Sequence, residues 1–204
     1  MKARIMGAMA RRVAASGAVL AALALLAGCV NLGGKPPKLL LGLTADKTAP
    51  AGAMASGKIS DALLVLDPQV ERKLDVLRVP VQVDATQIAY LQDAAWVERP
   101  ARQFRHLLAE TIRARGQRLV IEANDDTSGT KNVLAGRLID MGYDARSQSV
   151  VVRYDALRED SKGVVTARRF EAIVPGISAE PVAVAAALNR AANDVAAQVA
   201  DWLG

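Results

Sequence analysis

The sequence predicts a mixed α/β domain, on three observations. Short apolar segments typical of strands recur over residues 39–98, three longer ones follow over residues 133–174, and helical periods appear twice. Polar connections of hairpin length separate the longer segments, which indicates an antiparallel arrangement. We therefore expect a mixed sheet with an antiparallel C-terminal meander and two principal helices.

The N-terminal third contains short extended elements. We expect strands at Leu39–Thr44, Ile59–Leu66 and Leu74–Val83, with a loop of small residues at Ala45–Lys58 and a turn around Asp67-Pro68. Two further extended pieces, Gln87–Gln92 and Ala95–Glu98, flank Asp93-Ala94. This spacing predicts a tight hairpin.

A helix begins near residue 100, where the apolar period changes. Phe104, Leu108 and Ile112 mark one face, Pro100 suits the first turn, and Gly116 suits the C-cap. A strand at Leu119–Glu122 follows. The order from residue 95 to residue 122 is therefore that of a strand–helix–strand unit.

The C-terminal half begins with a polar loop, Asn124–Asn132. The meander strands are predicted at Val133–Tyr143, Val150–Leu157 and Val164–Val174. The last segment, Ala179–Leu203, is a long Ala-rich helix. Its apolar stripe consists of Leu188, Ala192, Val195, Val199 and Trp202.

The net charge of +5 is concentrated at the N-terminus. Residues 1–28 carry Lys2, Arg4, Arg11 and Arg12 and no acidic residue, and without them 22 basic side chains face 21 acidic ones. An apolar run from residue 13 to residue 26 follows the basic start. It would form about 21 Å of helix, too short for a bilayer core of about 30 Å. Residues 1–28 are therefore predicted to be a secretory signal peptide.

The apolar run ends in Leu26-Ala27-Gly28-Cys29, which resembles the lipobox of bacterial lipoproteins. The resemblance implies diacylglyceryl attachment to the Cys29 sulfur and cleavage before it. Residues 29–38 would be the acylated cysteine and a flexible Gly- and Pro-containing tether, and residues 39–204 a single domain. Val30, where an Asp would favour inner-membrane retention, implies an outer-membrane location facing the periplasm.

Candidate chemical motifs are weak. Gly52 to Lys58 match the start of a P-loop, but Ile59 takes the hydroxyl position and a strand pattern follows. The loop with Asn124, Asp126 and Ser128 lacks the acid that would complete a calcium site. His106 and Cys29 are the only residues of their types, so we expect no His/Cys metal site, no catalytic triad and no cofactor. Paired carboxylates at 125–126 and 159–160 are expected to be solvated. We expect no enzyme.

The helix near residue 100 is basic. Arg99, Arg102, Arg105 and Arg113 lie on it or at its ends, together with Arg115 and Arg118. An ordinary solvated face is one interpretation. The other is attraction to anionic headgroups or to an acidic partner subunit. Nucleic acid is not an expected partner, because the export signal takes the chain away from it.

The segment from Ile88 to Pro100, with Tyr90, Trp96 and then Phe104, resembles the signature of the ABC-type transport auxiliary lipoprotein family, which includes the paraquat-inducible C-type lipoproteins. The lipobox, the segment from residue 170 to residue 175 and the closing helix fall in family order. The resemblance implies an anticodon-binding-domain-like fold in three layers. It marks Tyr90, Trp96 and Pro100 as signature residues, with Trp96 expected in the core at the strand-to-helix junction.

The resemblance also implies a non-enzymatic partner of an ABC transporter and its MCE-type subunit, moving phospholipid or another hydrophobic envelope molecule by protein–protein contacts. Membrane attachment would be through the lipid anchor, and homo-oligomerisation is left open. The alternative is an independent envelope lipoprotein that binds a small apolar ligand or aids outer-membrane assembly.

Overall fold

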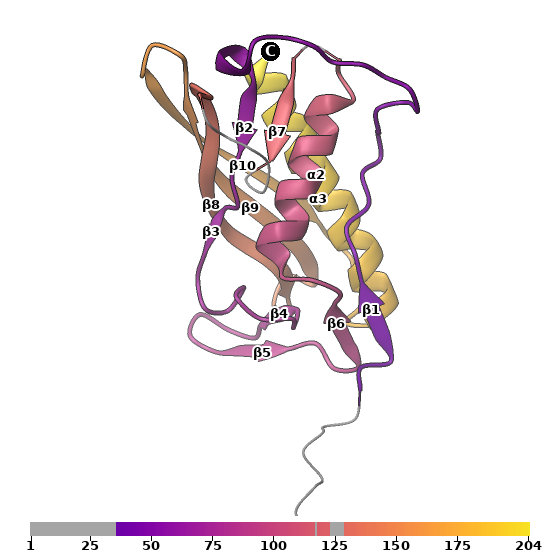
Figure 1. The fold of residues 1–204 in the computed structure, drawn as a ribbon. Coiled ribbons are helices and arrows are strands. Elements are labelled where there is room, and N and C mark those ends of the chain that lie inside the picture. The colour runs from indigo at the N-terminus through magenta and orange to yellow at the C-terminus, as the bar shows by residue number, and fades with distance from the viewer. Residues whose placement is uncertain (1–35, 117, 123–128) are drawn as a thin grey trace, which may run out of the picture. The chain divides into compact units, whose positions relative to one another are not determined.

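Three long strands form the centre of the fold (Figure 1). β8 (Asn132–Asp144), β9 (Ser149–Glu159) and β10 (Val165–Val174) pair antiparallel in chain order, so the predicted meander is confirmed. The computed structural model describes residues 36–116, 118–122 and 129–204, and residues 37–204 form one compact unit. The signal peptide, lipobox and Cys29 predictions lie outside the described residues, as does most of the predicted calcium-like loop.

Shorter strands extend this sheet on the far side of β8. β2 (Leu63–Val65) lies between β8 and β7 (Val120–Glu122) and is parallel to both, giving the order β10-β9-β8-β2-β7. β3 (Gln69–Val70) and β4 (Pro80–Gln82) also pair parallel with β8, and β5 (Ile88–Tyr90) pairs antiparallel with β4. The sheet is therefore mixed, as expected.

The predicted hairpin around Asp93 is wrong. β5 pairs with β4, whereas β6 (Ala94–Trp96) pairs parallel with β1 (Leu39–Leu41) in a separate two-stranded sheet. Asp93, at φ 56°, turns the chain from one sheet into the other. Because β6 and β7 belong to different sheets, the helix between them does not form a strand–helix–strand unit within one sheet.

All three predicted N-terminal strands are shorter than expected, and of Leu39–Thr44 only Leu39–Leu41 is a strand. In the segment 74–83 only Pro80–Gln82 is extended, and most of the residues before it form turns and bends. The segment 59–66 begins with a 3-10 turn at Ile59–Asp61 and only then enters β2. Both segments keep their buried apolar side chains, such as Leu74 and Leu63.

The two helices cover one face of the large sheet (Figure 1). α2 (Pro100–Arg113) packs on β7 and β2, while α3 (Pro181–Leu203) packs on β9, β10 and α2. Between helices and sheet lies the core, in which the rings of Phe104 and Tyr154 meet edge to face at 5.2 Å. The predicted α/β fold class with two principal helices is confirmed. The opposite face of β8, β9 and β10, named here the open face, carries no helix of the described chain.

Candidate functional site

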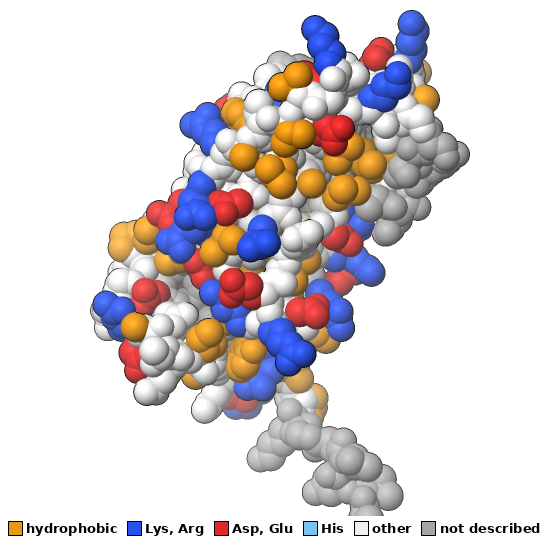
Figure 2. Space-filling model, turned by 90° about the vertical axis from the view of Figure 1, so that its left-hand side faces the viewer, with side chains coloured by type: hydrophobic (Ala, Val, Ile, Leu, Met, Phe, Trp, Pro, Cys, Tyr) orange, Lys and Arg blue, Asp and Glu red, His pale blue; other side chains and the backbone are white. Residues whose placement is uncertain are grey.

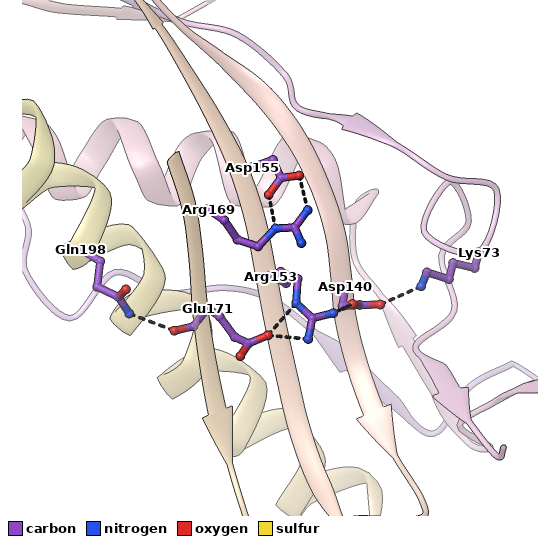
Figure 3. Close-up of polar contacts among 7 residues, drawn as sticks. All are labelled: Lys73, Asp140, Arg153, Asp155, Arg169, Glu171 and Gln198. Atoms are coloured by element: carbon purple, nitrogen blue, oxygen red, sulfur yellow. Dashed lines mark hydrogen bonds and ion pairs between the residues drawn. The ribbon is translucent and has the colours of Figure 1, made fainter. Parts of the chain in front are cut away.

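A row of alternating charges crosses the open face (Figure 3). Lys73 Nζ lies 2.7 Å from Asp140 Oδ1, and the other oxygen of Asp140 accepts from Arg153. The Arg153 guanidinium also donates to Glu171 on β10. The four side chains therefore form one continuous ladder across three strands, from a lysine before β4 to the sheet edge.

The ladder depends on a β-bulge. On β8, Leu134 and Leu138 face the core before the irregularity at Leu138/Asp140, and Met141 faces it afterwards. The extra residue switches which positions face the core, so Asp140 reaches the open face opposite Arg153. Strict alternation along the sequence would not have placed Asp140 there. Sequence reasoning missed the ladder for this reason.

A second charged pair lies beside the first row. Arg169 Nε and Nη2 donate to Asp155 Oδ1 and Oδ2 at 2.6 and 2.7 Å. These hydrogen bonds lower the pKa of Asp155 below its ordinary value, against a smaller opposing effect of burial. Bidentate pairs of this kind fix geometry as well as charge. The last side chain of each row lies on β10. These two side chains, Glu171 and Arg169, carry opposite charges and are two residues apart.

Two hollows flank the charged rows. The first, about 260 Å³, lies beside Lys73, Pro80, Gly142 and Arg153. The second, about 600 Å³, is lined by Leu66, Ala135, Leu157, Arg137 and Arg169 among others. Figure 2, seen from the side of β3 and β8, shows charged side chains of both signs across the middle of the molecule and apolar ones gathered above them.

The basic side chains predicted on α2 are paired with acids. Arg99 Nη1 lies 3.0 Å from Asp75, and Arg102 Nη1 lies 2.9 Å from Glu98. Both pairs are exposed, and they border a hollow of about 560 Å³. Arg113 is half-buried and donates to Glu122 at 2.8 Å. The helix is therefore not a bare positive surface, because the fold brings acids to it. Partner or membrane contact by these arginines stays a prediction.

Arg105 corrects the sequence analysis. Its side chain is fully buried, so the expectation that it belongs to an exposed basic face is wrong. Its guanidinium lies 3.2 Å from Asp67 and 3.3 Å from Glu122. His106, half-exposed, places Nδ1 2.6 Å from Glu122 Oε2 and Nε2 3.2 Å from Arg105 Nη2. Arg105 therefore joins α2 to β7 and to the turn after β2.

The signature residues belong to β5, β6 and the start of α2. β5 and β6 lie at the end of the molecule where the described chain begins (Figure 1). Trp96 is 2% exposed and belongs to the core cluster, directly before the α2 N-terminus. Pro100 is the first residue of α2. Tyr90 is half-buried, and the Arg78 guanidinium stacks 4.1 Å from its ring centroid. A contact of these residues with a partner is an expectation that the fold does not test.

The remaining motifs carry little chemistry. The P-loop-like residues 52–58 lie in a loop that enters the 3-10 turn at Ile59–Asp61. Asp160 accepts backbone hydrogen bonds from Lys162 and Val164 in the β9–β10 turn, while residues 123–128 lie outside the described chain. Within the described ranges no cluster of three His, Cys, Asp or Glu side chains is arranged to hold a metal ion. No helix among those residues has the length and apolar content for a membrane span.

The fold and its charged open face define a mixed α/β domain of the two-helix, mixed-sheet type. The family model described as ABC-type transport auxiliary lipoprotein component matches residues 43–200. The chain belongs to this family of cell-envelope lipoproteins that assist ABC transport, and the resemblance noted from the sequence is confirmed.

Solved structures show the same fold. Protein XCC0632 from Xanthomonas campestris is 20% identical with a TM-score of 0.67, covering 80% of this chain and 93% of its own. A crystal structure described only as an uncharacterised protein is 15% identical with a TM-score of 0.65, covering 82% and 99%. The comparison with curated proteins found no match.

Proposed function

We propose that this protein is the lipid-anchored accessory subunit of an ABC system whose other envelope component is an MCE-type subunit. Its cargo would be phospholipid or another hydrophobic envelope molecule. The family match over residues 43–200 carries the proposal. The fold agrees with a role in protein contacts, because its surface offers paired charges and shallow mixed hollows over a well-packed core.

Affinity isolation from detergent-solubilised envelopes tests the proposal. The wild-type chain is expected to recover MCE-domain and transporter subunits. Recovery of neither would contradict the proposal. Native mass spectrometry that found a bound lipid in the isolated protein, with no partner present, would favour the independent ligand-binding alternative instead.

The exposed arginines at the start of α2 are the proposed contact with an acidic partner. Replacing both Arg99 and Arg102 by Glu should reduce recovery of the partner, because it reverses two exposed charges (side chains 65% and 52% accessible). Arg190→Glu, on the exposed side of α3, is the matched control and should leave recovery unchanged. Equal recovery of the partner by both variants would show that these arginines do not belong to the interface.

The proposed anchor is Cys29, and the proposed location is the outer membrane facing the periplasm. Labelling with a palmitate analogue should mark the wild-type chain and not Cys29→Ser. Val30→Asp should move the protein to the inner-membrane fraction on a density gradient, if Val30 acts as the sorting residue. Unchanged labelling of the serine variant would contradict the lipoprotein proposal.

A further inference from the structure

β10 is a long edge strand of the large sheet. Its ten residues pair with β9 on one side, and no described strand pairs with it on the other. Val165 and Ile173 near its ends are 59% and 52% exposed. A long exposed edge with β-branched side chains is a template for pairing with another strand.

The outward backbone groups of β10 belong to its odd-numbered residues. At the hairpin, Asp160 N donates to Val164 O, so even positions are directed toward β9. In agreement, the carbonyl of Glu171 is directed away from β9 and accepts from the exposed side chain of Gln198 at 3.2 Å (Figure 3). Ala167, Arg169, Glu171 and Ile173 therefore present both their backbone groups to the edge and their side chains to the open face.

The charges at this edge are self-complementary. Glu171 ends one row with a negative charge, and Arg169 ends the other with a positive charge. A two-fold axis at Phe170, which lies between them, would place Arg169 opposite Glu171 of a second copy, twice. The same register places Ala167 opposite Ile173 of the second copy.

Neighbouring registers are less favourable. With an axis at Arg169, the Arg169 side chains of the two copies would lie opposite each other. With an axis at Glu171, the two Glu171 side chains would do so. Both registers place like charges directly opposite each other. An axis at Arg168 would face Arg169 with Ala167 and leave no opposite charge across the edge. Among these registers, only the one centred on Phe170 places opposite charges facing each other across the edge.

We propose that a second copy of this chain pairs antiparallel with β10 about a two-fold axis at Phe170. The two sheets become one, and each row runs through: Lys73, Asp140, Arg153 and Glu171 of one copy continue into Arg169 and Asp155 of the other. In the pair, the backbone N–H of Arg169 of the second copy replaces Gln198 at the Glu171 carbonyl. The interface is independent of which transporter the protein serves.

Disulfide trapping in the full-length chain tests the register. Facing residues in a hydrogen-bonded antiparallel pair have Cα atoms about 5.5 Å apart, within disulfide range. The variant carrying Ala167→Cys and Ile173→Cys should form a covalent dimer under mild oxidation in envelopes and after purification. Each single variant, and the wild-type chain whose only cysteine is Cys29, should not.

The variant carrying Val165→Cys and Ile173→Cys is the register control, because these positions face each other only when the axis lies at Arg169. More efficient trapping of this control than of the 167/173 variant would overturn the proposed register. Absence of a dimer with either pair, in a chain that sediments as a monomer, would overturn the pairing. A crosslink to a different envelope protein would show that the edge belongs to another partner.

Charge reversal gives a second measurement. Arg169→Glu and Glu171→Arg each place like charges across the axis, so each alone should self-associate at least about tenfold more weakly than wild type. Mixed together, the two variants pair opposite charges again, and heterodimers should form with near wild-type affinity. Each substitution breaks the same ion pairs within its own chain whichever copy it meets, so the comparison isolates the charges across the axis. Failure of the mixture to recover association would contradict the charge argument.

Discussion

A fully buried guanidinium lies among charged side chains in this domain. Arg105 sits between Asp67, Glu122 and His106 at the contact of α2 with β7. Burying a charge is costly unless charged or hydrogen-bonding groups surround it, and removal of one member weakens the compensation of the others. The cluster is therefore expected to tolerate loss of the arginine poorly.

Arg105→Ala should lower the free energy of unfolding by about 3–5 kcal/mol, measured by urea denaturation. Arg102→Ala is the control, since its partner Glu98 lies four residues away on an exposed surface. That exposed pair should contribute about 0.5 kcal/mol or less. Equal losses for the two variants would mean that burial of Arg105 has no energetic consequence.

Asp155 gives the stability a dependence on pH. Hydrogen bonds from Arg169 lower its folded pKa, so the ionised carboxylate contributes stability above its unfolded value of about 3.9 and loses that contribution as pH falls through the folded value. Arg169→Gln should therefore flatten the decline of stability below about pH 4. Thermal melts across this range measure the effect. Arg168→Gln, which leaves the Asp155 contact intact, should keep the wild-type slope.

At the scale of elements, the spacing of apolar residues predicted the helices and long strands, whose pattern is local in the sequence. α2 begins at Pro100 and buries Phe104 and Leu108 as its apolar stripe requires, and β9 alternates as expected. The pairing of β6 with β1 could not be read in the same way. It joins Leu39 to Ala94 across a long stretch of chain, and its strands are too short to show a period. The polar turn at Asp93 suggested a hairpin that the long-range pairing excludes.

The pairing of β4 with β8 depends on a glycine. A Cβ atom added to Gly142 would lie 2.4 Å from the Pro80 carbonyl oxygen, which is backbone and cannot rotate away. Gly142→Ala should therefore destabilise the protein by about 3 kcal/mol, through separation of β4 from β8. Chemical denaturation measures the loss. Gly57→Ala, in a loop where an added Cβ meets no atom within 4 Å, should change the stability little.

At the scale of the molecule, the sequence shows where basic side chains are concentrated, but only the fold shows which acidic side chains pair with them. The sequence shows a run of arginines around residues 99–118, while the acids that meet them come from elsewhere, Asp75 from a turn and Glu122 from β7. The ion pairs of the open face could not be predicted from the sequence either, because Asp140 and Glu171 contact Arg153 only when three strands have assembled. The candidate site was missed from sequence because each of its pairs joins different elements.

The tether and the folded unit should be energetically separate. Residues 37–204 form one compact unit, so we expect a single cooperative unfolding transition. Cys29→Ser should abolish membrane attachment. The midpoint temperature of unfolding, measured by calorimetry, should stay the same as in the wild-type chain. A shift of several degrees would instead indicate that the N-terminal residues contribute to the stability of the folded unit.

The position of β2 sets the order in which the sheet can be completed. Leu63 pairs with Val120 and Asn132, which are 57 and 69 positions later in the chain. A chain that leaves the ribosome or an export channel N-terminus first must keep this apolar strand without a partner until β7 and β8 have emerged. β8, β9 and β10 meet across short turns and close rapidly. The apolar strand β2 is therefore synthesised well before both of its partners, and its backbone groups stay unpaired in the sheet for that interval.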